Sequence, residues 1–340
     1  MKKLRVLAMM HADLVPPDDI SGLTDTEVAP YKTEFDVVST LRELGHHVRP
    51  LGVLSDLGVI REAIADWEPD IVFNLLEEFD GIATYDQHVV SYLELLRAPY
   101  TGCGPRGLML SRDKALAKQI LSYHRIQVPD FAVFPRHRAI RRPRRLHFPL
   151  FVKSLVEEAS LGISRASIVE NDEQLAERVR FIHQRIGTDA IAEQYIEGRE
   201  VYVGIMGDQR LKIFPTWELL FTKMPEGAPR IATRKAKWDF AYQKKWGIIS
   251  KEALDLPPGM ENLIPRIAKR IYRSLGLDGY ARMDMRLSQD GQVYVLEANP
   301  NPQLAYGEDF AESAEKAGVD YAALLQRIIN LGLRRGARPA

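Results

Sequence analysis

Two carboxylates and one amide near the C-terminal end of the chain have the spacing of a metal site. Asp284 lies in a predicted strand at 280–287, Glu297 and Asn299 follow a second strand at 292–296, and a Ser-Gln-Asp-Gly turn joins the two. Pairing these strands folds Asp284 back toward Glu297. Oxygen ligands of this kind suit Mg²⁺ shared with phosphate oxygens rather than zinc. The pattern is equally compatible with a hairpin whose acidic residues lie at a solvated rim.

Two lysines and a loop of small residues could bind phosphate. Lys114 begins a predicted helix, and Lys153 ends an apolar strand. A charge that closes a buried strand needs a partner, and phosphate is the obvious one. The loop around Ser160 could lie over phosphates with its backbone N–H groups. The sequence has no Walker A motif, no G-x-G-x-x-G, no C-x-x-C and no H-E-x-x-H, so the P-loop, dinucleotide and zinc classes lack support.

A third pattern is the segment from Glu193 to Glu200, a strand followed by a tight turn at Gly198 and a second strand. A linker between strands can offer backbone groups to the edge of an adenine ring. An acid beyond it can accept hydrogen bonds from ribose hydroxyls. By itself the pattern could belong to any polar hairpin.

Length and composition predict a globular protein of two or three packed units. The 340 residues are 46% hydrophobic and 27% charged, with a formal net charge of zero, which predicts no nucleic-acid partner. The single cysteine, Cys103, excludes an internal disulfide and suits a reducing compartment. No apolar run approaches the ~18 residues of a membrane span. We therefore expect a soluble, cytoplasmic protein without a membrane partner.

Two further features have a functional and a structural interpretation. Residues 136–147 hold six arginines, which could bind phosphate or nucleic acid, but no aromatic residues interleave for base stacking, and a solvated loop is the simpler interpretation. Cys103 could be a nucleophile, but no activating neighbour is visible.

The elements that position these residues follow the hydrophobic pattern. Strands alternate with helices over the first hundred residues, which predicts a doubly wound parallel sheet with its ligands at the carboxyl ends of the strands. A helix is expected at 111–123, a single strand at 210–217, and frayed residues beyond Gly332. The predicted strands of the first part are residues 4–10, 48–53 and 71–75, and its helices are 34–44, 57–67 and 88–96.

In order and spacing these pieces resemble the D-alanine–D-alanine ligase branch of the ATP-grasp superfamily. The resemblance runs from about residue 72 to residue 325. The spacing of thirteen from Asp284 to Glu297 and of seven from Glu193 to Glu200 matches that family. The implied fold is a substrate-side α/β domain with a doubly wound parallel sheet, and two α+β subdomains that clasp ATP. The implied boundaries are 1–105, 106–190 for the small subdomain, and 191–335 for the large one with the metal site.

The resemblance implies a role for each matching residue. Arg282 resembles the arginine that holds the tetrahedral intermediate, and Lys237 lies on a loop that closes over ATP and reaches its γ-phosphate. Asp284, Glu297 and Asn299 resemble the ligands of two Mg²⁺ ions, for which Mn²⁺ can substitute. The implied ATP-binding residues, besides Lys237, are Lys114, Lys153, Ser160, Glu193, Gln194, Ile196, Glu200 and Leu296.

The implied activity joins a small carboxylic acid or amino acid to an amine. A carboxylate is a poor electrophile, so it first attacks the γ-phosphorus of ATP to give an acyl phosphate; the amine then displaces phosphate. D-alanine–D-alanine ligase proper is one alternative. Others are an ATP-grasp kinase and a nucleotide-binding regulator, although a regulator would be expected to lack a metal carboxylate or a phosphate lysine. Family members are usually homodimers, so a homodimer is implied.

The chain departs from the family pattern on the substrate side. The family's N-terminal glutamate motif is absent, and either Glu27 or Glu34 could replace that glutamate. Glu77-Glu78 stand where the family has His-Gly. Glu308 and Asp309 align with the Ser-Leu pair that receives the carboxylate of the second D-alanine. Two acids would repel a carboxylate, so we expect an amine with a cationic or hydroxylated group, unless both side chains turn to solvent.

Overall fold

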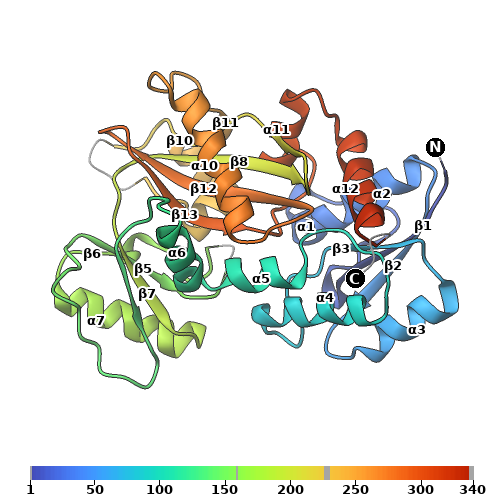
Figure 1. Ribbon diagram of the computed structural model, residues 1–340, viewed down its shortest axis with the longest axis horizontal. Coiled ribbons are helices and arrows are strands. Elements are labelled where there is room, and N and C mark those ends of the chain that lie inside the picture. Colours follow the sequence, from blue (N-terminus) through green and yellow to red (C-terminus); the bar gives the residue numbers. More distant parts are fainter. Residues whose placement is uncertain (1, 158–159, 226–229, 337–340) are drawn as a thin grey trace.

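The computed structural model describes residues 2–157, 160–225 and 230–336, which fold around three β-sheets (Figure 1). The N-terminal sheet is parallel, with strand order β2-β1-β3. Its strands are β1 (Arg5–His11), β2 (His47–Val53) and β3 (Ile71–Asn74). Their carboxyl ends meet at one edge, where such sheets bind ligands.

Helices cover both faces of this sheet, which confirms the predicted doubly wound arrangement. Leu7 and Met9 of β1 pack into one core, and Val6, Ala8 and Met10 pack into another. A strand segment buried on both faces must be apolar, and residues 6–10 of β1 are. The helices are α3 (Gly58–Trp67) and α4 (Asp86–Leu95) on the first face, and α2 (Lys32–Glu43) and α12 (Tyr321–Gly336) on the second.

The second sheet is antiparallel and has strand order β4-β7-β5-β6. Helix α7 (Asp172–Phe181), which continues as a π-helical turn to Ile186, buries Leu175 and Val179 against Val152 and Ala192 of the sheet. The strands are β4 (Phe131–Phe134), β5 (Leu150–Ser154), β6 (Ile168–Val169) and β7 (Ala190–Gln194). Helix α6 (Lys114–Tyr123) lies between this sheet and the third one (Figure 1).

The third sheet has six strands, ordered β11-β10-β8-β12-β13 with β9 beside β8. Helix α10 (Met260–Ser274) packs Ile264 and Ile271 against one face, and Phe310 of α11 (Asp309–Lys316) packs against Phe214 and Tyr280 on the other. The strands are β8 (Gly198–Gly207), β9 (Leu211–Ile213), β10 (Trp217–Phe221), β11 (Ile248–Glu252), β12 (Tyr280–Ser288) and β13 (Val293–Asn299).

Two sequence-based predictions of single elements are wrong. The strand expected at 210–217 is two strands, β9 and β10, because Pro215 between them has no N–H for a sheet ladder. The helix expected at 111–123 is α6 alone, preceded by α5 (Pro105–Arg112). Asp113 separates them, since its side chain accepts hydrogen bonds from the first N–H groups of α6. The remaining short helices are α1 (Asp25–Val28), α8 (Arg234–Trp238) and α9 (Phe240–Trp246).

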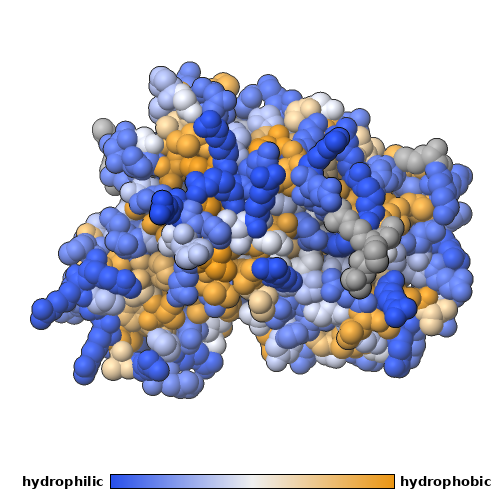
Figure 2. Space-filling model, viewed as in Figure 1, coloured by the Kyte–Doolittle hydropathy of each residue, from blue (hydrophilic) through white to orange (hydrophobic). Residues whose placement is uncertain are grey.

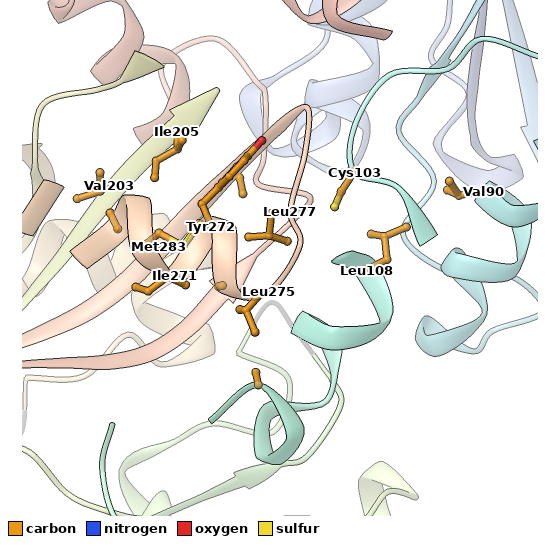
Figure 3. Packing of buried hydrophobic residues seen from close by; sticks show 14 of the residues in the cluster. Val90, Cys103, Leu108, Val203, Ile205, Ile271, Tyr272, Leu275, Leu277 and Met283 are labelled. Carbon is orange, nitrogen blue, oxygen red and sulfur yellow. The ribbon is translucent and has the colours of Figure 1, made fainter. Parts of the chain in front are cut away.

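A continuous hydrophobic core joins the third sheet to the N-terminal unit (Figure 3). Ile271 of α10 lies near Met283 of the sheet, Leu275 follows the end of this helix, and Leu277 points toward Cys103 and the helix α5. Cys103 is 2% exposed, and burial raises the pKa of its thiol far above the ordinary value, so the nucleophile interpretation of this residue lacks support.

The end of α12 is tied down rather than frayed, so the expectation for residues 333–336 is wrong. Arg335 donates hydrogen bonds to the carbonyl oxygens of Gly102 and Tyr100, at 2.9 and 2.6 Å, and pairs with Asp278 at 3.0 Å. Its guanidinium lies 3.8 Å from the centre of the Tyr100 ring. Residues 337–340 lie outside the described residues.

Hydrophilic residues dominate the face of the molecule shown in Figure 2, with smaller hydrophobic groups between them. Among the described residues, no helix has the length and apolar character needed to cross a membrane.

Gly332 lets α12 approach the N-terminal sheet closely, and Gly332→Ala should destabilise the protein. A Cβ atom there would collide with the carbonyl oxygen of Tyr100, a backbone atom that cannot rotate away. We expect a loss of about 1–3 kcal/mol in the free energy of unfolding, measured by urea titration. Gly104→Ala is the control, because its Cβ would meet its nearest atoms at 3.5 Å; equal losses in both variants would contradict the prediction.

Candidate active site

A cavity lies between the four-stranded and six-stranded sheets. Side chains from β5, β7, β8, β12 and β13 contribute to its lining. All the residues that the sequence predicted for ATP binding line this cavity: Lys114, Lys153, Ser160, Glu193, Gln194, Ile196, Glu200, Lys237 and Leu296. The metal candidates Asp284 and Glu297 line the same cavity.

A buried carboxylate shared by two lysines lies at the back of this cavity. Glu193 on β7 is 2% exposed, and its Oε1 lies 3.3 Å from the Nζ of Lys153 and 3.4 Å from that of Lys118. Burial lowers the pKa of Lys118 to about 8 although Glu193 opposes the shift. For Lys153 the nearby carboxylates outweigh burial and raise the pKa. Both lysines keep a positive charge near neutral pH, which suits a phosphate site.

Lys118 is a site residue that the sequence analysis did not assign. Its Nζ donates to the carbonyl oxygen of Leu296 at 2.7 Å, so it links α6 to β13. The sequence did carry a signal, because Lys114 and Lys118 are four residues apart and therefore share one face of the helix. That face is buried. Hydrophobic periodicity predicts apolar residues, not lysines, on a buried face.

The ribose-side candidate Glu200 is held by two neighbours. The Tyr202 hydroxyl donates to it at 2.9 Å, and Arg286 on β12, directly opposite in the ladder, donates at 2.6 Å. The turn before it needs glycine, because Gly198 has a φ of 151° and a Cβ there would collide with the carbonyl oxygen of Leu287. The turn at Gly198 carries the chain from β7 of the four-stranded sheet to β8 of the six-stranded sheet.

The hairpin of β12 and β13 brings the metal candidates together as predicted. In its register Asp284 faces Glu297 and Arg282 faces Asn299, so all four lie on one side of the sheet. Arg282 donates to both carboxylate oxygens of Asp284, at 2.7 and 2.8 Å. The register shifts just beyond this pair and leaves Leu296 unpaired, a bulge beside the cavity.

Burial and cations act in opposite directions on the two carboxylates. Burial raises the pKa of Asp284, and Arg282 offsets only part of this effect. Burial also acts to raise the pKa of Glu297, but Lys114, Lys153 and Lys237 outweigh it and bring the pKa to about 2. Glu297 therefore stays ionised at any ordinary pH, as a metal ligand must.

The segment that carries Lys237 forms part of the cavity lining. Thr233 caps α8, and the Ser160 hydroxyl donates to the carbonyl oxygen of Ala232 at 2.8 Å, which joins the loop around Ser160 to this segment. Gln243 donates to the carbonyl oxygen of Lys237 at 3.1 Å. Lys237 is thereby placed at the junction with a second cavity, which it also lines.

The second, larger cavity opens at the carboxyl ends of β1 and β3 and reaches the β12–β13 hairpin. Arg282, Asn299 and Glu297 line it, and Glu297 is shared with the first cavity. Of the substrate-side candidates, Glu34, Glu308 and Asp309 line it too.

The structure distinguishes the two candidates for the missing N-terminal glutamate. Glu27 is exposed and forms a capping box with Thr24 at the start of α1, so it is not among the residues that line either cavity. Glu34 on α2 is 6% exposed and lines the second cavity. Burial raises the pKa of Glu34 to about 7, and only its own backbone N–H opposes the shift.

A cavity between two antiparallel sheets, with buried lysines and paired carboxylates in its lining, is typical of the ATP-grasp class. A family model described as D-ala D-ala ligase C-terminus matches residues 120–330, and the chain belongs to this family of ATP-dependent carboxylate–amine ligases. It is 31% identical over 306 residues to a D-alanine–D-alanine ligase of Nitratidesulfovibrio vulgaris, covering 89% of this chain and 92% of that protein.

Two further relatives support the same placement. The protein y4sG of Sinorhizobium fredii, whose function is uncharacterised, is 30% identical over 306 residues, covering 88% of this chain and 87% of its own. The crystal structure of D-alanine–D-alanine ligase from Bacillus anthracis complexed with ATP has a TM-score of 0.73, with 22% identity and 98% of both chains covered. The predicted ATP-grasp fold is thus confirmed.

Replacing Glu34 with glutamine should stabilise the protein at high pH. Its pKa in the folded protein, about 7, lies above the ordinary 4.5, so the carboxylate ionises more easily in the unfolded chain. Stability is therefore lost as the pH rises from about 4.5 to 7, by at most about 3 kcal/mol. Glu34→Gln should raise the melting temperature at pH 8 and leave it unchanged at pH 4. Glu43→Gln, exposed on the same helix, is the control, and a pH-independent shift would contradict the assignment.

Proposed function

We propose that this protein uses MgATP to activate the carboxylate of an amino acid or small acid and joins it to an amine, releasing ADP and phosphate. One observation carries the proposal. The phosphate-side cavity and the larger cavity meet at Lys237 and Glu297, so a γ-phosphate in the first would adjoin a carboxylate bound in the second. Phosphoryl transfer needs this adjacency more than any covalent chemistry from the protein.

The residues at the junction fit the two steps. Lys114, Lys153 and Lys237 would spread the charge of the γ-phosphoryl group while a carboxylate oxygen attacks phosphorus and ADP leaves. The amine nitrogen would then attack the acyl carbon, and phosphate would leave with the electrons of the broken C–O bond. Arg282 lies in the second cavity beside the metal candidates, where it could stabilise the oxyanion.

Asp284, Glu297 and Asn299 fit Mg²⁺ by the chemistry of their donors. All are oxygen donors on one face of the hairpin, and a carboxylate that accepts from Arg282 keeps lone pairs for a metal. No group of three or more His, Cys, Asp or Glu that could hold a metal stands together in the described part of the chain, so phosphate oxygens would complete the shell. The metal, two ions in this proposal, would neutralise phosphate charge, and Mn²⁺ should substitute.

On the substrate side, we assign Glu34 rather than Glu27 to a cationic group of the acid substrate. It is the buried carboxylate of the two, and it reaches the cavity from α2. D-alanine–D-alanine ligase proper is the second candidate, because several relatives at 26–31% identity carry that name. A kinase would stop after the first step, and a nucleotide-binding regulator would complete neither.

The proposal also includes the domain boundaries and the oligomeric state. The three units would be the substrate-side domain 1–105, the small subdomain 106–190 and the large subdomain 191–335, in a cytoplasmic homodimer. Sedimentation equilibrium measures the oligomeric state, and a monomer at micromolar concentration would contradict that part.

The deciding experiment measures ADP, free phosphate and product mass together, with MgATP and pools of D- and L-amino acids, small diacids and amines. ADP and phosphate in equal amounts with a condensed product would confirm a ligase and identify its substrates. A product with D-alanine alone would favour the second candidate. A phosphorylated acid without free phosphate would indicate a kinase, and no consumption of ATP would favour the regulator.

Two substitutions should separate phosphate binding from metal binding. Lys153→Met removes a cation from the phosphate wall, and Asp284→Asn weakens the metal site; each should lower the rate of ADP formation about 100-fold or more. Added Mn²⁺ should restore part of the activity of Asp284→Asn but none of that of Lys153→Met. Lys3→Met, at an exposed position far along the chain from the site, should match the unaltered protein. Full activity of Lys153→Met would refute the phosphate assignment.

A further inference from the structure

The larger cavity carries a strong negative charge. Seven carboxylates line it against one lysine and one arginine, a formal charge of −5 with His11 neutral. Both cations have other roles, since Lys237 also faces the nucleotide cavity and Arg282 donates to both oxygens of Asp284. The seven acids are Asp13, Glu34, Glu77, Glu78, Glu297, Glu308 and Asp309.

Two of these carboxylates have no cationic partner in the described structure. The side chains of Glu34 and Glu308 make no hydrogen bond or ion pair with another described residue, although Glu34 is only 6% exposed. Burial first, and then Asp309, raise the pKa of Glu308. Lys32, Arg282 and Lys237 oppose this shift but form no direct ion pair with Glu308 among the described residues. Lys32 is bound to Asp36 at 2.7 Å and to the carbonyl oxygen of Tyr306 at 2.6 Å. A buried carboxylate without a partner either shifts its pKa toward the protonated form, as Glu34 does, or pairs with a cation that binds from outside the protein.

Glu308 is not explained as a helix cap. It occupies the N-cap position of α11, but its side chain makes no capping hydrogen bond. A helix N-terminus would favour a bound anion, yet here two acids occupy it. Asp309 lies 3.8 Å from Arg282, so this acidic wall adjoins the site where the acyl group would react. A free carboxylate on the incoming amine would therefore meet like charges beside the reaction centre.

The two carboxylates belong to different elements, α2 and the start of α11, and so would receive separate positive charges. The ammonium of an amino acid substrate supplies one of them, at Glu34. The second must come from the amine substrate, whose attacking nitrogen has to be neutral. The geometry points to an amine substrate that is a diamine or polyamine without a free carboxylate, with one neutral nitrogen attacking and a second, protonated nitrogen paired with Glu308. This inference rests on the proposed ligase function.

Three amines of similar length test the charge requirement. They are 1,4-diaminobutane, n-butylamine and 4-aminobutanoate, which end in an ammonium, a methyl group and a carboxylate. With MgATP and the acid substrate, we expect KM for the diamine to be at least about 30-fold below that for n-butylamine, with 4-aminobutanoate poorest. Diamines of two to six carbons would locate the best length. A preference for n-butylamine or 4-aminobutanoate over every diamine would overturn the inference.

A variant ties the preference to one side chain. In Glu308→Gln, the ratio of KM for n-butylamine to KM for the diamine should fall to about threefold or less, chiefly because KM of the diamine rises. Glu315→Gln, exposed on the same helix, should keep the full gap. Isothermal titration of the same amines should show the same loss of affinity without turnover. An unchanged gap in Glu308→Gln would overturn the assignment of this residue.

Hydroxylamine separates failure of this inference from failure of the proposed function. It is a small neutral nucleophile that traps an acyl phosphate as a hydroxamate, whatever the natural amine. Hydroxamate formation without a preference for diamines would leave the ligase proposal standing and overturn the inference. No hydroxamate and no ADP with any acid of the pools would overturn both.

Discussion

The pairing of β12 with β13 is the constraint on which the rest of the site depends. Its register sets Asp284 against Glu297 and Arg282 against Asn299 on one face. A slip of one residue would send the side chains of one strand to the opposite face. The pairing of β8 with β12 positions a further site residue, because it brings Glu200 opposite Arg286. The residues proposed as metal ligands, oxyanion group and ribose-side acid are therefore positioned by two adjoining ladders of backbone hydrogen bonds.

Buried charge is the second organising feature. Glu193 lies between Lys118 and Lys153, and the three side chains are 2–8% exposed. Pairs of this kind contribute little net stability, because desolvation offsets much of their attraction. The shared carboxylate helps both lysines to stay charged, and Lys153 lines the nucleotide-side cavity. A bound triphosphate would neutralise the lysines of this cavity, and a bound metal ion would neutralise its carboxylates.

The two cavities differ in how they treat charge. The nucleotide cavity mixes lysines with carboxylates, whereas the larger cavity is acidic and has few cations of its own. Membership of the D-alanine–D-alanine ligase family accounts for the first cavity. The second carries the features particular to this chain, at Glu34, Glu77, Glu78, Glu308 and Asp309. What distinguishes the larger cavity is thus its negative charge, next to a cavity that mixes both signs.

The sequence alone determined the frame of the site. Strand periodicity and the turn before Gln292 predicted the hairpin that brings Asp284 toward Glu297, because this depends on local pairing, whereas the grouping of the phosphate-side residues rested on the family resemblance. The tertiary structure decided what local pattern cannot encode. It buried Lys118 on a helix face and anchored Arg335 on Tyr100. It also buried Glu34 beside the larger cavity and left Glu27 exposed as a helix cap, a difference that only packing determines.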